Sequence, residues 1–73
     1  MPKLIRVKEI NEETIIVAYG IQYFCIHTFG RRNSKHIIRK AAAEIGDRRY
    51  MKLGQLLAIT KKHDLVITSK GKR

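Results

Sequence analysis

Cysteine and histidine are the residues of this chain with the most versatile chemistry, as metal ligands, nucleophiles and bases. Cys25 and His27 stand two positions apart in a segment with strand character, so both side chains are expected on one face of that strand. Such a pair supplies half of a zinc site, which needs three or four ligands, and His36 and His63 stand alone. We therefore predict no metal site, and interpret Cys25 as a packed thiol and His27 as an ordinary histidine.

The sequence does not predict catalysis. No pair of carboxylates is spaced for general acid–base work, and no glycine-rich phosphate loop is present. Ribonucleases that work without a metal use Arg, Lys, His and Tyr, and this chain has all four types, but no arrangement of them singles out an active site. We predict a protein that is not an enzyme and needs no cofactor.

The segment GRRNSK, residues 30–35, offers phosphate-binding chemistry instead. It precedes an apolar pattern typical of a helix, so it is expected at a helix N-terminus, where free backbone amides and the helix dipole attract anions. Arginine adds a forked donor that suits phosphate oxygens. The predicted phosphate contacts of this region are Arg31, Arg32, Asn33, Ser34, Lys35 and Arg39.

Charge is distributed unevenly along the chain. The 73 residues carry a net charge of +10, yet in residues 1–30 three basic residues balance three acidic ones. Residues 31–73 hold thirteen Lys and Arg against three acidic residues, so the whole excess lies there. Self-repulsion on this scale opposes compactness unless an anionic partner offsets it, and nucleic acid is the commonest such partner. We therefore expect the partner to bind residues 31–63.

The first thirty residues have the composition of β-strands. Three segments rich in β-branched and aromatic residues predict an antiparallel meander in residues 1–30. The polar residues 11–13 form the expected first turn. Gly20 fits either a second turn or a bulge within one long strand.

The following residues have helical periodicity. Ser34 is the expected N-cap of a first helix, which Gly46 ends. A second helix is expected from Asp47 to about Thr60. Its predicted inner residues are Tyr50, Leu53, Leu56, Leu57 and Thr60, and its predicted outer residues are Arg48, Lys52, Gln55, Ile59 and Lys62.

Residues 64–69 predict a final strand that joins the sheet, and residues 70–73 a frayed basic tail. The chain is thus expected to form one α+β domain over residues 1–73. It would have the order β-β-β-α-α-β, a three- to four-stranded antiparallel sheet, and two helices on one face of that sheet.

The two predicted helices resemble a helix-turn-helix over about 25 residues. Ala42 stands four positions before the turn residue Gly46, and Leu53 and Leu56 could anchor the second helix, although Asp47 stands where an apolar residue is usual. The resemblance implies that the second helix enters a major groove of DNA, where Arg pairs with guanine and Gln with adenine. The residues offered to DNA would be Arg48, Arg49, Lys52 and Gln55.

A third basic cluster lies farther along the chain, at Lys61 and Lys62, and the basic tail continues it. Such clusters follow a phosphate backbone without reading its sequence. The favoured interpretation is a small DNA-binding regulatory or accessory protein, for which a homodimer on a two-fold site would be natural.

Two other functions use the same cations. An RNA-binding or ribosome-associated protein would expose Tyr23 and His27 on the sheet for contact with bases. A protein-interaction module, either an inhibitor or an adaptor, would dock its basic face on an acidic protein, or pair the edge of its first strand with another chain. The single cysteine, the lack of a long apolar run and the lack of a signal-peptide pattern in the first ten residues predict a cytoplasmic protein without membrane contact.

Overall fold

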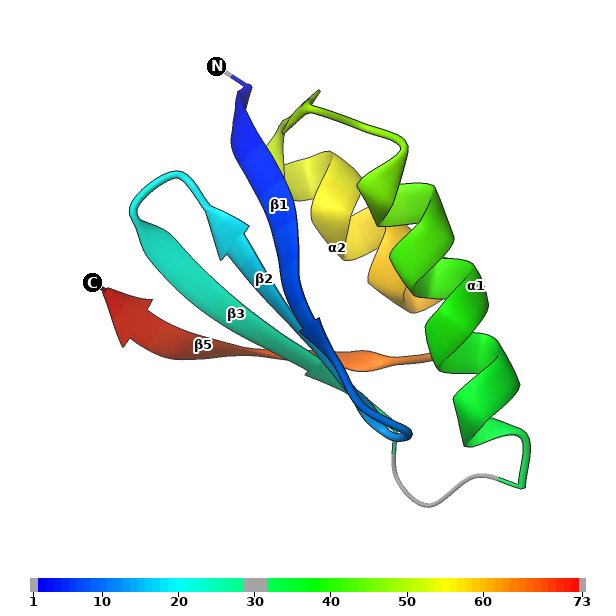
Figure 1. The fold of residues 1–73 in the computed structure, drawn as a ribbon. Coiled ribbons are helices and arrows are strands. Elements are labelled where there is room, and N and C mark those ends of the chain that lie inside the picture. The colour runs from blue at the N-terminus through cyan, green and yellow to red at the C-terminus, as the bar shows by residue number, and fades with distance from the viewer. Residues whose placement is uncertain (1, 29–31, 73) are drawn as a thin grey trace.

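A curved antiparallel sheet carries two helices on one face in the computed structural model, which describes residues 2–28 and 32–72 (Figure 1). The chain order is β1 (Lys3–Ile10), β2 (Thr14–Tyr19), β3 (Gln22–His27), α1 (Ser34–Gly46), β4 (Tyr50–Met51), α2 (Leu53–Lys62) and β5 (Val66–Lys72). The strands lie in the order β4-β1-β2-β3-β5, and each neighbouring pair is antiparallel. The predicted α+β class is confirmed, with five strands in place of three or four.

The meander forms as predicted, and its turns have identifiable causes. Asn11 closes the first hairpin because its Nδ2 donates to Glu9 Oε2 at 3.1 Å and to Thr14 Oγ1 at 3.0 Å. Gly20 has φ +62°, a left-handed conformation that glycine adopts without strain, so it is a turn residue between β2 and β3. A bulge was the other alternative for Gly20, but the register shifts lie elsewhere, in β1 between Val7 and Glu9 and in the β3–β5 pairing between Tyr23 and Phe24.

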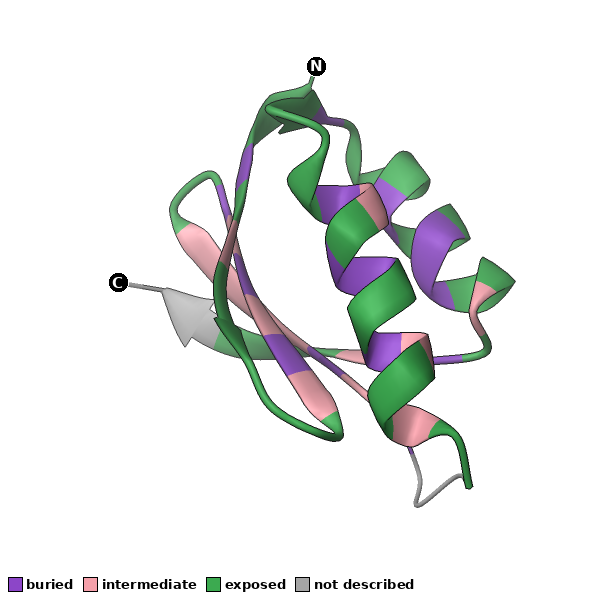
Figure 2. Ribbon diagram, turned by 45° about the vertical axis from the view of Figure 1, so that its right-hand side comes forward, coloured by how far each residue is buried: buried purple, intermediate pink, exposed green. Residues whose placement is uncertain are grey.

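The core lies between the sheet and the helices. Strand alternation sends one set of side chains toward the helices, and α1 packs over β1 and β2 while α2 packs against α1 and β5 (Figure 2). The most deeply buried large side chains are Ile15, Val17, Ile26, Ile38, Ile45, Met51 and Leu56. The other face of the sheet carries no helix within the described residues.

Helix α1 begins one residue earlier than predicted. Its N-cap is Asn33 rather than Ser34, and the Asn33 side chain makes no cap hydrogen bond, although the Asn33 carbonyl accepts from Ile37 N at 3.0 Å. Gly46 was expected just beyond the helix, as its C′ residue, but it is the last helical residue, and Asp47 forms the C-cap, with its N–H donating to Ala43 O at 3.0 Å.

The predicted start of the second helix at Asp47 is wrong. The chain first runs along β1, where Ile5 N donates to Arg49 O at 3.0 Å and Tyr50 pairs with Leu4. Helix α2 begins only at Leu53. This pairing with a distant strand overrides a local pattern that also fits a helix.

The face that α2 buries also differs from the expectation. Leu56 and Thr60 are buried as predicted, but Ile59, expected outside, is only 6% exposed. Leu53 and Leu57, expected inside, are 42% and 43% exposed. The helix contacts both α1 and β5, so its buried face lies where these two elements meet it.

The final strand extends beyond the prediction. It was expected over residues 64–69, but β5 runs from Val66 to Lys72 beside β3, and so includes most of the predicted frayed tail. Leu65, just before the strand, is buried. In the described part of the chain, neither helix has the length and apolar character that crossing a membrane requires.

Candidate nucleic-acid interface

Basic side chains form a stripe along α1 and the turn before it. Arg32, Lys35, His36 and Arg39 follow the spacing i, i+3, i+4, i+7, which places them on one side of a helix. These side chains are exposed, and together with Asn33 and Ser34 they line one surface hollow. We call these four basic residues the α1 stripe, and the hollow that they line gathers five of the six phosphate contacts predicted for this region. Arg31, also predicted, lies outside the described residues.

The electrostatics of this end of α1 favour an anion. The first turn contains no acidic residue, and the side chain of the N-cap residue Asn33 does not cap its free amides. Lys35 and His36 stand in that turn, so the helix dipole adds to their positive charge, although Glu12 of the first hairpin lines a neighbouring hollow with Lys35 and Arg39. Among the described residues, no acidic side chain forms an ion pair with a member of the α1 stripe.

Arg48 and Arg49 lie elsewhere and are not on a helix. They occupy the connection from α1 to β4 and line a hollow beside β1 with Arg6 and Val7. Because six residues, 47–52, separate the two helices and part of that segment is a strand, the predicted helix-turn-helix is not formed. Arg48 and Arg49 therefore do not lie on the helix that was predicted to carry them into a DNA groove.

Lys52 and Gln55 begin α2. Lys52 is the N-cap, and its N–H donates to the Gln55 side-chain Oε1 at 2.8 Å. The Gln55 oxygen thus satisfies a backbone donor at the helix start, which is one half of a capping box. This contact gives Gln55 a structural role at the start of α2, and its predicted contact with adenine stays a prediction.

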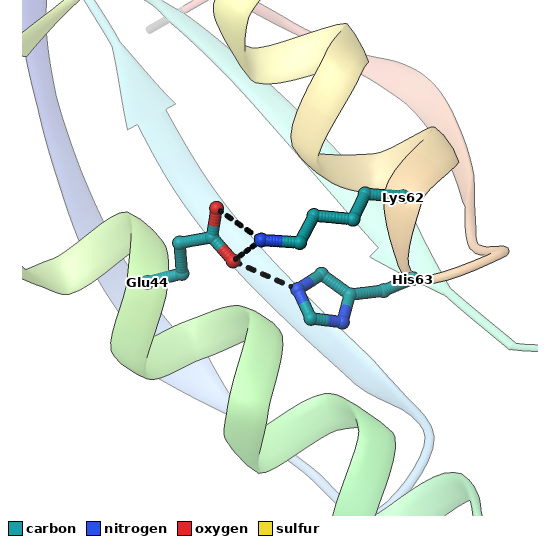
Figure 3. Close-up of polar contacts among 3 residues, drawn as sticks. All are labelled: Glu44, Lys62 and His63. Carbon is teal, nitrogen blue, oxygen red and sulfur yellow. Dashed lines mark hydrogen bonds and ion pairs between the residues drawn. The ribbon is translucent and has the colours of Figure 1, made fainter.

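Lys61 and Lys62 occupy the last turn of α2, where positive charge suits the helix dipole. Lys62 Nζ lies 3.3 Å from Glu44 Oε1, and His63 Nε2 donates to the same oxygen at 2.9 Å (Figure 3). The His63 hydrogen bond, followed by the effects of Lys62, lowers the pKa of the Glu44 carboxyl from its ordinary value. This contact joins α1 to the end of α2, so Lys62 already has an internal partner.

The helix-free face of the sheet also carries basic and aromatic residues. Arg6, Lys8 and Tyr23 line a hollow there, although they belong to the charge-neutral part of the chain. The outward alternation of Arg6 and Lys8 is readable from the sequence, but their proximity to Tyr23 depends on strand register. Tyr19 lies on the opposite, buried face, and Phe29 lies outside the described residues.

In residues 2–28 and 32–72, no three His, Cys, Asp or Glu side chains are grouped so that they could hold a metal ion. No known protein family, curated protein or solved structure matches this chain. The α1 stripe therefore has to be judged by its own geometry and charge.

Proposed function

We propose that this protein binds nucleic acid without catalysing a reaction, and that the α1 stripe contacts the phosphate backbone. The observation that supports this most directly is the gathering of Arg32, Lys35, His36 and Arg39 around one hollow, with no acidic partner among the described residues. Two arginines provide forked donors for phosphate oxygens, and the N-terminus of α1 adds its dipole.

The length of the stripe suits a regular backbone. Arg32 and Arg39 are seven positions apart, which is about 10 Å along a helix. Phosphates of one DNA strand advance by about 3.4 Å along the duplex axis while the strand winds around it, so successive phosphates lie farther apart than this rise and the stripe can reach about two of them. Duplex DNA, with its rigid and evenly spaced phosphates, is the favoured polymer, and RNA is the alternative.

The test is a fluorescence titration with duplex DNA, single-stranded DNA and RNA at several salt concentrations. Each phosphate contact contributes about 0.9 to the slope of log affinity against log salt on duplex DNA. The double variant Lys35→Ala/Arg39→Ala should therefore reduce the slope by about 1.8. Between about 50 and 200 mM salt, the variant should lose about 12-fold less affinity than the wild type loses.

A matched control variant distinguishes a specific effect of the α1 stripe on binding from an effect of net charge. Arg48→Ala/Lys52→Ala removes one Arg and one Lys at the opposite end of α1, and should leave the slope nearly unchanged. Equal effects of the two variants would show that net charge alone drives binding, and would overturn the role of the α1 stripe. Weak binding to all three polymers at physiological salt would overturn nucleic acid as the partner.

The second candidate function is docking on an acidic protein, and exposed apolar residues of α2 favour it. Leu53 and Leu57 are one turn apart and exposed, with Lys52 and Lys61 close in sequence. An acidic amphipathic helix would complement both the apolar side chains and the charge, whereas a second copy of this cationic chain would be repelled. Binding of a Leu- and Glu-rich helical peptide, lost in Leu53→Ser/Leu57→Ser, would support this function.

A further inference from the structure

The helix-free face of the sheet has a gap in its row of side chains. Strand register aligns Arg6 of β1 with Ala18 of β2, and Ala18 with Tyr23 of β3. Alternation places these three residues on the face away from the helices, because their strand neighbours Ile5, Val17 and Tyr19 are buried against the helices. The smallest residue of the row therefore stands between two large ones.

This arrangement forms a slot. Directly paired residues on neighbouring antiparallel strands have their Cβ atoms about 5 Å apart, so Arg6 and Tyr23 stand about 10 Å apart across Ala18. The hollow there has a volume of about 330 Å³, and Leu4, Lys8 and Ile21 also line it. Its floor is small and apolar, one wall carries an aromatic ring, and two cations stand on the other side.

The chemistry of the slot matches a nucleotide. A planar base can lie over Ala18 and stack on the Tyr23 ring, an interaction that accepts any base because every base has a π-face. The Arg6 guanidinium and the Lys8 ammonium can then bind the attached phosphate. Exposed Leu4 and Ile21 offer apolar contact to the base and sugar.

We infer that the slot between Arg6 and Tyr23 binds one nucleotide, with its base stacked on Tyr23 and its phosphate held by Arg6 and Lys8. The inference takes its ligand class from the proposed function, but it uses a surface on the other side of the sheet from the α1 stripe (Figure 1). The nucleotide can be an unpaired residue of a nucleic acid strand or a free mononucleotide, since both present the same base and phosphate.

The experiment follows the fluorescence of 2-aminopurine, which stacking on an aromatic ring quenches. One arm uses a single-stranded oligonucleotide with one 2-aminopurine, and the other uses the free 2-aminopurine nucleotide. Ala18→Leu fills the slot and should weaken binding about 5- to 150-fold, the range that corresponds to the loss of one base–aromatic stack. Ala58→Leu, at an exposed position of α2, adds the same side chain elsewhere and should leave binding unchanged.

A second pair of variants tests the stacking wall. Tyr23→Phe keeps the ring and should retain both quenching and affinity, whereas Tyr23→Ala should lose both, with circular dichroism verifying that each variant is folded. Quenching in both arms would show that a free nucleotide suffices, and quenching in the oligonucleotide arm alone would identify a strand as the source. Either result supports the slot, provided that Ala18→Leu abolishes the quenching.

Unchanged binding and quenching in Ala18→Leu and Tyr23→Ala would overturn the slot. That failure is distinct from failure of the proposed function, because duplex DNA binding would still respond to Lys35→Ala/Arg39→Ala. Conversely, the wild type could quench 2-aminopurine while Lys35→Ala/Arg39→Ala leaves the salt slope of duplex binding unchanged. That result would support the slot and overturn the role of the α1 stripe. Absence of binding in both 2-aminopurine arms, together with absence of binding to duplex DNA, would overturn both.

Discussion

The burial of α2 makes opposite predictions for two neighbouring aliphatic residues. Ile59 is 6% exposed and belongs to the core, whereas Leu57 is 43% exposed. Replacing a buried isoleucine with alanine destabilises a protein by about 2–5 kcal/mol, through lost burial and the cavity left behind. Replacing an exposed leucine changes stability by only about 0.5 kcal/mol. The free energy of unfolding of a chain of this size is about 4–11 kcal/mol, so Ile59→Ala removes a large part of it.

The assay is thermal and urea unfolding of Ile59→Ala and Leu57→Ala, followed by circular dichroism. At about 3 kcal/mol, Ile59→Ala should lower Tm by about 12–24 °C, while Leu57→Ala should change it by no more than about 4 °C. Alanine favours helix at both positions, so helix propensity cannot produce this difference. A larger loss in Leu57→Ala than in Ile59→Ala would refute the burial of α2 described above and restore the helical phase predicted from the sequence.

Three further predictions concern single sites. Gly20→Ala should destabilise the protein by about 1–2 kcal/mol in urea unfolding, because φ is +62° and the new Cβ would lie 3.0 Å from Lys3 Cδ. Gly54→Ala, in the first turn of α2 with open space around it, should instead stabilise by up to about 1 kcal/mol, and similar effects of the two changes would contradict the turn at Gly20. Thr28→Val should be neutral or stabilising by up to about 3 kcal/mol in the same assay, because Thr28 Oγ1 is buried and has no hydrogen-bond partner among the described residues; a clear loss would contradict this. Glu44, whose pKa is lowered in the folded state, stabilises the fold above its ordinary pKa of 4.5, and this contribution disappears as pH falls through the folded value. The unfolding midpoints of wild type and Glu44→Gln should therefore differ at pH 7 and converge in acid, and a constant difference would exclude the ion pair as the cause.

Elements governed by local patterns were predictable from the sequence. The meander follows from β-branched residues on either side of polar or glycine turns, and α1 follows from the stripe that Ile38, Ala41, Ala42 and Ile45 form. The grouping of Arg32, Lys35 and Arg39 was predictable for the same reason, because helical spacing alone brings these residues together.

Elements that depend on distant pairing were not predictable. Residues 47–52 have a spacing that also fits a helix, and only the pairing of Tyr50 and Met51 with β1 makes that segment extended. The slot on the sheet was missed for a similar reason. Arg6 and Lys8 belong to a charge-neutral segment, and only the register of three strands brings Arg6 into one row with Tyr23.

The position of β5 beside β3 has a consequence for the order of folding. Both helices lie between these two strands in the chain, within residues 28–65, so their pairing closes a long loop, whereas the meander forms from local contacts. We therefore expect β5 to join after the meander has formed, as β4 does through its equally distant pairing with β1, so that the edge of β3 is exposed for a period. Exposed strand edges pair with other molecules, but a net charge of +10 keeps copies of this chain apart during that period. The charge that suits an anionic partner thus also protects the incomplete sheet from aggregation.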